Sequence, residues 1–118
     1  VGTAGFVTTS GDFAKFAIAC MPDHRPKSAE RILSRASLDA MLAPSPDWKY
    51  SGIGVFHKPI EGVATIGHTG GDRGWTSTFR MVPASGDALL VFQNCYEAEA
   101  LSRKIESVWA LWLRGRLR

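Results

Sequence analysis

A histidine and a threonine precede two glycines in the second half of the chain. The four residues are His68, Thr69, Gly70 and Gly71. Because glycine has no Cβ, a substrate can approach backbone N–H groups closely at such a stretch. Gly71 could then donate its N–H to a developing oxyanion, while His68 and Thr69 hydrogen-bond the substrate or support proton transfer. The stretch therefore indicates one half of an acyl-transfer site, although a tight glycine turn with an incidental histidine explains the spacing more simply.

The other half of such a site, a nucleophile with its base, does not appear in the sequence. The nucleophile elbow Gly-x-Ser-x-Gly is absent, and so is Ser-x-x-Lys, which places a serine one helical turn from an activating lysine. Ser45 and Lys49 are one residue too far apart, and Pro46 favours a loop there. Tyr-x-Asn, Ser-x-Asn and the common phosphate loops are also missing. We therefore expect no catalysis from these 118 residues alone.

Three histidines raise the question of a metal site. If the chain turns near Pro59, His57 and His68 lie about six residues apart along a hairpin, on the order of 20 Å at ~3.3 Å per residue. One zinc ion cannot bridge that distance, and His24 lies in a proline-rich loop without a partner at ligand spacing. The sequence therefore predicts no metal and no cofactor. The two cysteines form no C-x-x-C pair and are expected to be buried thiols: they are Cys20 and Cys95.

The composition is typical of a globular chain, with 45% apolar and 21% charged residues. A length of 118 residues suits one domain or part of a larger one. The formal net charge is +3, and the basic surplus is concentrated in residues 103–118, which favours a solvated helix face over a nucleic-acid-binding arm. No run is long and apolar enough to span a membrane. The chain starts at Val1, so an upstream segment is expected and the compartment stays open.

Three helices are expected to frame the candidate site. Thr9 caps the first, which ends before Pro22, and Ser34 caps the second, which ends before Pro44. A closing helix over 97–114 carries an apolar stripe that should face a sheet. The stripe comprises Leu101, Ile105, Val108, Trp109 and Trp112.

Four β-leaning segments lie between the second and third expected helices. They are residues 50–56, 63–67, 75–82 and 88–92. Short turns join them, so an antiparallel meander is the simplest sheet. The turns fall at 58–62, 72–75 and 83–86. All four tryptophans are expected to pack rather than to bind a ligand: they are Trp48, Trp75, Trp109 and Trp112.

The expected strand 88–92 is apolar on both faces, and an unbroken apolar run needs cover on both sides. The closing helix covers one side, but the helical segment 1–47 offers too little to cover the other. We therefore expect an α+β fold in one incomplete domain, with residues 48–118 forming the sheet and the closing helix. The chain is then a piece of a larger two-layered protein, or it associates with further copies, because uncovered strands promote aggregation.

The order of these pieces is more specific than any one of them. The pieces are residues 4–17, 32–42, 50–54, 68–71, 74–77 and 90–94. In this order they resemble the C-terminal part of the serine β-lactamase and penicillin-binding-protein family. The resemblance is closest to the class C-like branch, which includes DD-peptidases, esterases and D-aminopeptidases. It covers nearly the whole chain, from Gly2 to the closing helix.

The family carries three active-site motifs, Ser-x-x-Lys, Tyr-x-Asn and Lys/His-Thr/Ser-Gly. Only the third is present, as His68, Thr69 and Gly70. The resemblance implies that the next residue, Gly71, supplies one oxyanion N–H and that a nucleophilic serine outside this chain supplies the other. Histidine in the first place is similar to the peptidase and esterase members. Histidine side chains are mostly neutral near pH 7, whereas a lysine would be a permanent cation for a substrate carboxylate.

The chemistry that the resemblance implies is acyl transfer through a serine ester. The substrate would be a small molecule or peptide with an amide, lactam or ester carbonyl. The family sheet has five or more antiparallel strands, with terminal helices on one face and a helical domain on the other. The implied partners are an N-terminal segment of the same protein or a second copy, with no nucleic acid. Two alternatives remain: a noncatalytic binding or assembly module on a truncated hydrolase fold, and an unrelated α+β domain with a fortuitous motif.

Overall fold

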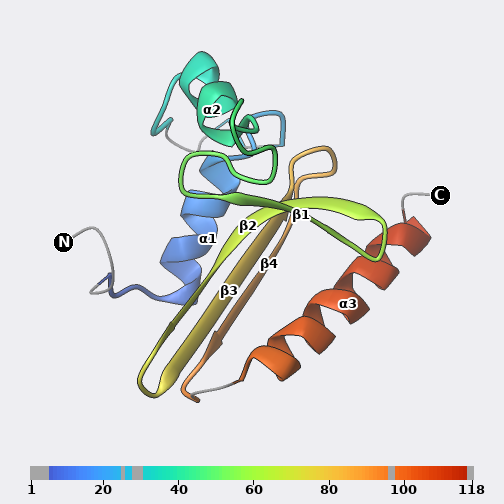
Figure 1. The fold of residues 1–118 in the computed structure, drawn as a ribbon. Helices are drawn as coiled ribbons and strands as arrows, with labels where there is room; N and C mark the ends of the chain where they lie inside the picture. Colours follow the sequence, from blue (N-terminus) through green and yellow to red (C-terminus); the bar gives the residue numbers. More distant parts are fainter. Residues whose placement is uncertain (1–5, 25, 28–30, 96–97, 117–118) are drawn as a thin grey trace.

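Consecutive hairpins between residues 56 and 93 form one antiparallel sheet, with helices around it (Figure 1). The computed structural model describes residues 6–24, 26–27, 31–95 and 98–116. In this part of the chain the strands are β1 (Phe56–Ile60), β2 (Val63–Asp72), β3 (Trp75–Val82) and β4 (Asp87–Gln93). The helices are α1 (Ser10–Ala19), α2 (Arg35–Leu42) and α3 (Glu99–Arg116). The strands lie in the order β1-β2-β3-β4, so the predicted α+β class and antiparallel meander are confirmed.

The first two helices begin where their capping side chains predict. The Thr9 hydroxyl accepts a hydrogen bond from the backbone N–H of Asp12 at 3.1 Å, and the Ser34 hydroxyl accepts one from Ser37 at 3.1 Å. These bonds satisfy N–H groups that the first helical turn leaves without intrahelical partners. Pro44 closely follows α2, and a proline has no N–H with which to continue the helix.

The first hairpin differs from the predicted one. The sequence predicts a strand over 50–56 and a turn near Pro59, but β1 is Phe56–Ile60 and the turn is Glu61–Gly62. Both turn residues have positive φ, 48° and 80°, as the two-residue hairpin turns that match strand twist require. Pro59 is tolerated because β1 is an edge strand, where the missing N–H costs no ladder bond.

The second strand continues through the paired glycines. The sequence predicts that it ends at Gly67, but β2 reaches Asp72 and pairs with β3 throughout its second half. The chain reverses at Arg73–Gly74, where a turn is predicted, and the second turn residue takes the left-handed conformation with φ 81°. A glycine turn at Gly70–Gly71 is therefore wrong, because both glycines lie in paired strand.

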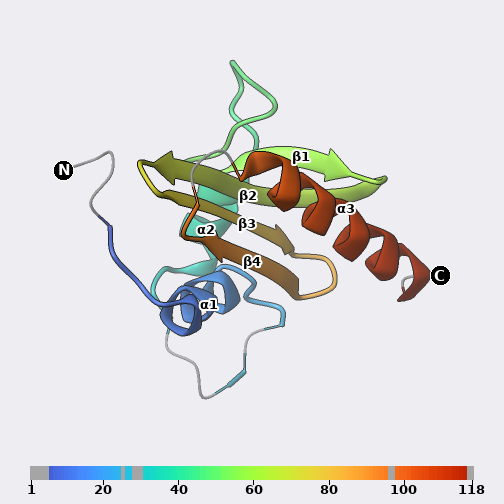
Figure 2. The same ribbon diagram turned by 90° about the horizontal axis from the view of Figure 1, so that it is seen from below.

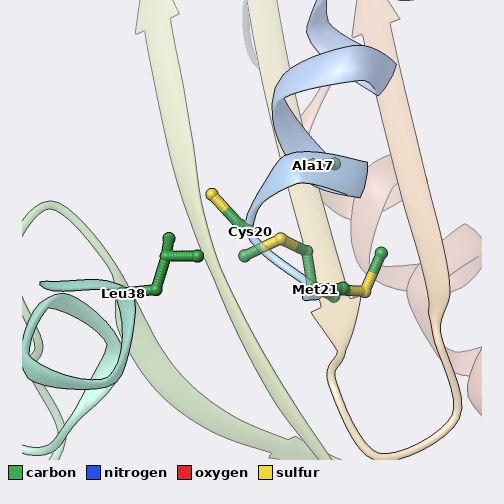
Figure 3. Close-up of a cluster of buried hydrophobic side chains, with 5 residues drawn as sticks. Ala17, Cys20, Met21 and Leu38 are labelled. Atoms are coloured by element: carbon green, nitrogen blue, oxygen red, sulfur yellow. The ribbon is translucent and has the colours of Figure 1, made fainter. Parts of the chain in front are cut away.

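The helices cover opposite faces of the sheet (Figure 2). On one face α1 and α2 close over a cluster with β3 (Figure 3). Its buried members are Ala17, Cys20, Met21, Leu38 and Met81. On the other face α3 closes over a second cluster. Its buried members are Ile60, Val63, Val82, Ala110 and Leu113. Because β3 contributes to both clusters, the sheet forms part of the core on both of its faces.

The side of α3 that faces the sheet matches the predicted stripe only in part, at Trp109 and Ile105. Its buried residues are Ser102, Glu106, Ala110 and Leu113. Leu101, Val108 and Trp112 belong to the predicted stripe but are 54%, 62% and 54% exposed. The reason lies in the sheet, which presents the buried Arg80 to the helix. The helix therefore turns a carboxylate toward the sheet, rather than its most apolar side.

Other predicted core positions are also exposed. Trp75 is 64% exposed beside the turn at the tip of the β2–β3 hairpin, where neither α1 nor α3 reaches (Figure 1). Trp48 and Cys95 are exposed as well, whereas Cys20 is buried and Trp109 packs against the cluster under α3. No residue of β4 is fully buried, so the cover that its apolar sequence calls for is not complete within the described residues.

Candidate functional site

The candidate residues lie together on β2, beyond the point where β1 stops pairing. The last pair between β1 and β2 is Phe56 with Gly67, whereas β3 pairs with β2 as far as Asp72. Residues 68–71 therefore have β3 on one side. Among the residues that the structure describes, no strand pairs with their other side. We call this side the open edge of β2.

The hairpin turn determines which backbone groups face the open edge. Residues that flank a two-residue turn such as Arg73–Gly74 exchange hydrogen bonds, and every second pair along the strands does the same. His68 and Gly70 accordingly bond to β3. The N–H and C=O groups of Thr69 and Gly71 point to the open edge. The N–H that the sequence assigns to an oxyanion is thus not used by the β2–β3 ladder.

A hollow of about 660 Å³ lies beside the open edge, between the sheet and α3. Thr69, Gly70 and Gly71 form part of its wall. A Cβ built on Gly71 would find no atom nearer than Trp75 O, 3.8 Å away, so the glycine leaves room beside its N–H. Further lining residues come from β1, β3 and α3, and they include Phe56, Lys58, Arg80, Ser102 and Glu106.

Two contacts hold the half-buried imidazole of His68. Its Nδ1 lies 2.5 Å from the carbonyl oxygen of Thr69, and its ring centroid lies 4.9 Å from that of Phe56 at an interplanar angle of 31°. Trp48 in turn meets Phe56 edge-on, with a centroid distance of 5.8 Å. A carbonyl oxygen can only accept, so Nδ1 carries the proton in this contact. In the neutral ring Nε2 is then an acceptor, able to take a hydrogen bond or a proton from a ligand.

A buried carboxylate forms part of the hollow. The Glu106 side chain is 3% exposed and accepts hydrogen bonds from Arg80 Nε at 2.7 Å, Lys58 Nζ at 3.1 Å and Thr78 Oγ1 at 3.2 Å. Burial acts to raise the pKa of this carboxyl, but the hydrogen bonds from Arg80 and Lys58 outweigh it, and the pKa lies below its ordinary value of 4.5. Glu106 is therefore an anion at neutral pH, and its two cationic partners leave this cluster with a net positive charge.

Sequence reasoning missed this network, although one signal was present. Arg80 and Thr78 alternate with Phe79 and Met81 along β3, so the strand has one polar and one apolar face. A polar face is usually solvated, and nothing in the sequence shows that α3 covers it. From the sequence alone, Glu106 is therefore expected to be an ordinary exposed charge on the surface of a helix.

The other histidines do not join the candidate residues. The 20 Å separation of His57 from His68 is wrong, because His57 pairs with Ile66, two positions before His68 on β2. The Nε2 of His57 lies instead 2.8 Å from the carbonyl oxygen of Leu42, and that of His24 contacts the β3–β4 turn. In the described part of the chain, no group of His, Cys, Asp and Glu side chains is placed to hold a metal ion.

None of the helices that the structure describes has the length and apolar character to cross a membrane.

Comparison with known proteins does not identify the family of this chain. No family model matches the sequence, no curated protein is significantly similar to it, and no solved structure significantly matches the fold.

Proposed function

We propose that this chain is the C-terminal portion of a serine hydrolase of the β-lactamase, DD-peptidase or esterase type. It would contribute the third active-site motif and one oxyanion N–H to acyl transfer through a serine ester. The observation that carries the proposal is the open edge of β2, where Gly71 directs its N–H outward beside a hollow and has no side chain in the way. The order of the motifs along the sequence supports it further.

In the proposed reaction the nucleophile is a serine outside these 118 residues. Its hydroxyl oxygen attacks the carbonyl carbon of the substrate, and the carbonyl oxygen becomes an oxyanion that accepts a hydrogen bond from the Gly71 N–H. The backbone N–H of the serine is the second donor. The intermediate collapses to the serine ester and expels the leaving group as a protonated amine or alcohol. Water then attacks the ester, releases the acid and restores the serine.

His68 and Thr69 would contact the substrate at the same edge but from opposite faces of the sheet, because successive side chains of a strand alternate. Thr69 pairs with Thr78, whose hydroxyl reaches Glu106 on α3, so the Thr69 side chain lies on the side of the sheet that faces the hollow. The Nε2 acceptor of His68 suits an N–H or O–H of the substrate or leaving group. A substrate carboxylate offers only acceptors, so it matches His68 only when the imidazole is protonated.

A noncatalytic binding or assembly module is the second candidate, because the chain contains neither Ser-x-x-Lys nor Tyr-x-Asn. The open edge would then bind a carbonyl ligand without turning it over. The sequence upstream of Val1 in the natural protein separates the two candidates. Ser-x-x-Lys followed by Tyr-x-Asn supports the enzyme, and their absence supports the module.

Covalent labelling tests the proposal directly. The isolated chain should not react with a fluorescent penicillin or a fluorophosphonate, because it lacks the nucleophile. The full-length protein should be labelled on a serine, and adding the upstream segment to the chain in trans should restore labelling. Labelling of the isolated chain, or no labelling of the full-length protein by either probe, would contradict the proposal.

A pair of variants in the full-length protein tests the oxyanion role. Gly71→Pro removes the outward N–H without removing a bond to β3, and should slow acylation by about 100-fold or more. Gly71→Ala keeps the N–H and is the matched control. Wild-type acylation rates in Gly71→Pro would remove Gly71 from the mechanism.

In the same full-length protein, His68→Ala tests the contact with the substrate and should slow acylation by about one order of magnitude or more.

A further inference from the structure

The loop before β1 exposes large aromatic side chains next to the open edge of β2. Residues 43–55 join α2 to β1 and project beyond β1 at the edge of the sheet (Figure 2). Trp48 and Tyr50, in this loop, are 56% and 52% exposed. Phe56 follows the loop, is half-buried, and pairs with Gly67 at the point where the open edge begins. Exposed apolar surface beside a hollow is typical of a ligand-binding site.

Backbone contacts hold this loop against the end of α2. The Ser51 N–H donates to the carbonyl oxygen of Trp48 at 3.0 Å, and the Ile53 N–H donates to that of Met41 at 2.9 Å. A Cβ on Gly52 would lie 2.7 Å from the Met41 oxygen, so the loop approaches the helix more closely than a larger residue allows. The loop is therefore in place before a ligand arrives, and binding to it costs little further ordering.

The aromatic rings form a continuous row from the loop to the open edge. Trp48 contacts Phe56 with a centroid distance of 5.8 Å, and Phe56 contacts His68 with one of 4.9 Å. Phe56 also lines the hollow together with Thr69 and Gly71. Neither Trp48 nor Phe56 is a member of the two core clusters found among the described residues. We call the rings of Trp48 and Phe56 the aromatic ledge.

We propose that the aromatic ledge binds an aryl group of the substrate and thereby selects carbonyl substrates in which that group is carried on a linker. Gly67, the partner of Phe56, lies four residues from Gly71, about 13 Å along β2 at ~3.3 Å per residue. A substrate whose carbonyl oxygen meets the Gly71 N–H therefore reaches Phe56 only through several bonds. The inference rests on the proposed function, because it takes that N–H as the place where the carbonyl binds.

The ring geometry and the nearby charges favour an uncharged aryl group. Trp48 and Phe56 meet at an interplanar angle of 68°, so a flat ring that lies parallel to one of them meets the other nearly edge-on. Aromatic pairs favour both of these arrangements. Aromatic faces also attract cations, but Lys58, Arg80 and Glu106 line the same hollow and together carry a net positive charge. That charge repels a cationic substituent.

Ester hydrolysis by the full-length protein tests the selection. The 4-phenylbutyrate ester of p-nitrophenol should be hydrolysed with a higher kcat/KM than the acetate ester, and Trp48→Ala should reduce this ratio about tenfold or more. Trp48→Phe keeps a ring and should retain most of the ratio. Trp112→Ala removes a tryptophan that is 54% exposed on α3 and is the matched control, with the ratio of wild type.

A second pair of esters, ethyl acetate and 4-phenylbutyl acetate, places the aryl group on the leaving side instead. Loss of the preference in Trp48→Ala for either pair supports the inference. A preference that Trp48→Ala leaves unchanged in both pairs, or no preference in either, would overturn it.

A binding measurement on the isolated chain separates this inference from the proposed function. N-methyl-4-phenylbutyramide carries the same carbonyl and aryl groups and needs no nucleophile to bind. In NMR titrations it should shift the indole N–H signal of Trp48, assigned with Trp48→Phe, about tenfold more than N-methylacetamide does at the same concentration. If this amide binds while the full-length protein hydrolyses no ester, the proposed function fails and the aromatic ledge remains a binding site. If the esters are hydrolysed but the indole signal does not move, the inference alone fails.

Discussion

The two contacts of His68 select one of its two neutral tautomers. The carbonyl oxygen of Thr69 can only accept from Nδ1–H, and the ring of Phe56 limits the rotation of the imidazole. We therefore expect the neutral ring in the isolated chain to carry its proton on Nδ1 and to leave Nε2 unprotonated. Nitrogen-15 NMR of the imidazole measures this directly and does not require catalysis. A ring protonated on Nε2 would contradict the assignment of Nε2 as an acceptor.

Replacing Phe56 tests how the imidazole is held. Phe56→Leu removes the ring contact but keeps an apolar side chain, so the tautomer preference of His68 should weaken toward that of free histidine. Trp75→Leu removes an exposed aromatic ring from the same end of the sheet and should leave the tautomer unchanged. The same spectra check both variants. An unchanged tautomer in Phe56→Leu would show that the Thr69 contact suffices.

Two glycines of β2 should differ sharply in what they tolerate. A Cβ on Gly67 would overlap the backbone carbonyl of Phe79, whereas a Cβ on Gly71 would make only an ordinary contact with Trp75 O at 3.8 Å. Because neighbouring strands cannot separate without loss of ladder bonds, Gly67→Ala should lower the free energy of unfolding by about 2–4 kcal/mol. Gly71→Ala should change it by less than about 1 kcal/mol. Urea denaturation measures both, and equal losses would contradict the described fit of β2 against β3.

At the level of elements, the attachment of α3 depends on one buried carboxylate. The Arg80 side chain is 4% exposed, so a neutral side chain at position 106 leaves a buried cation without its counter-charge. Glu106→Gln should therefore lower the free energy of unfolding at neutral pH by about 2–4 kcal/mol. Glu99→Gln removes an exposed carboxylate from the same helix and should leave stability nearly unchanged. Chemical denaturation followed by circular dichroism distinguishes the two.

The same carboxylate makes the stability depend on pH. The pKa of Glu106 is lower in the folded protein than its ordinary value of 4.5 in the unfolded chain, so between these values the unfolded state binds more protons. The contribution of Glu106 is therefore complete above about pH 4.5 and is lost as the pH falls through the folded-state pKa. The urea midpoints of wild type and Glu106→Gln should converge in acid. A constant difference between them would mean that the ion pair is not its cause.

The elements differ in how far their sequence predicts them. Helices α1 and α2 are predicted well because Thr9 and Ser34 act on N–H groups within one turn. β1 is misplaced because the positive φ of Glu61–Gly62, and not Pro59, sets the hairpin. The facing side of α3 is only partly predicted, because apolar periodicity alone does not reveal the buried Arg80 beneath the helix.

The candidate site shows the same limit. His68 and its glycines can be found in the sequence because their residue types already suggest contact with a ligand. Their open edge could not be found, since it exists only where β1 stops pairing with β2, at Phe56 and Gly67. The β1–β2 pairing starts at the hairpin turn Glu61–Gly62, so this turn, several residues away, sets where the pairing ends.

The molecule as a whole is built on both faces of β3. Met81 belongs to the cluster under α1 and α2, and the next residue, Val82, belongs to the cluster under α3. Leu38, from the helical segment 1–47, and Met81, from the sheet, are members of one cluster. The helical segment and the sheet thus share their packing, and the two faces should unfold together.

A core substitution on one face should therefore weaken the opposite face by the same amount. Leu38 is the buried residue of α2 and is 3% exposed, so Leu38→Ala should lower the free energy of unfolding by about 2–5 kcal/mol. Native-state hydrogen exchange should show the same loss for the amides of α1 and for those around Ala110 of α3 if the chain is one cooperative unit. Leu101→Ala, at a 54% exposed position, is the control and should change protection by less than about 0.5 kcal/mol. Loss of protection confined to α1 and α2 would instead mean that the two faces unfold independently.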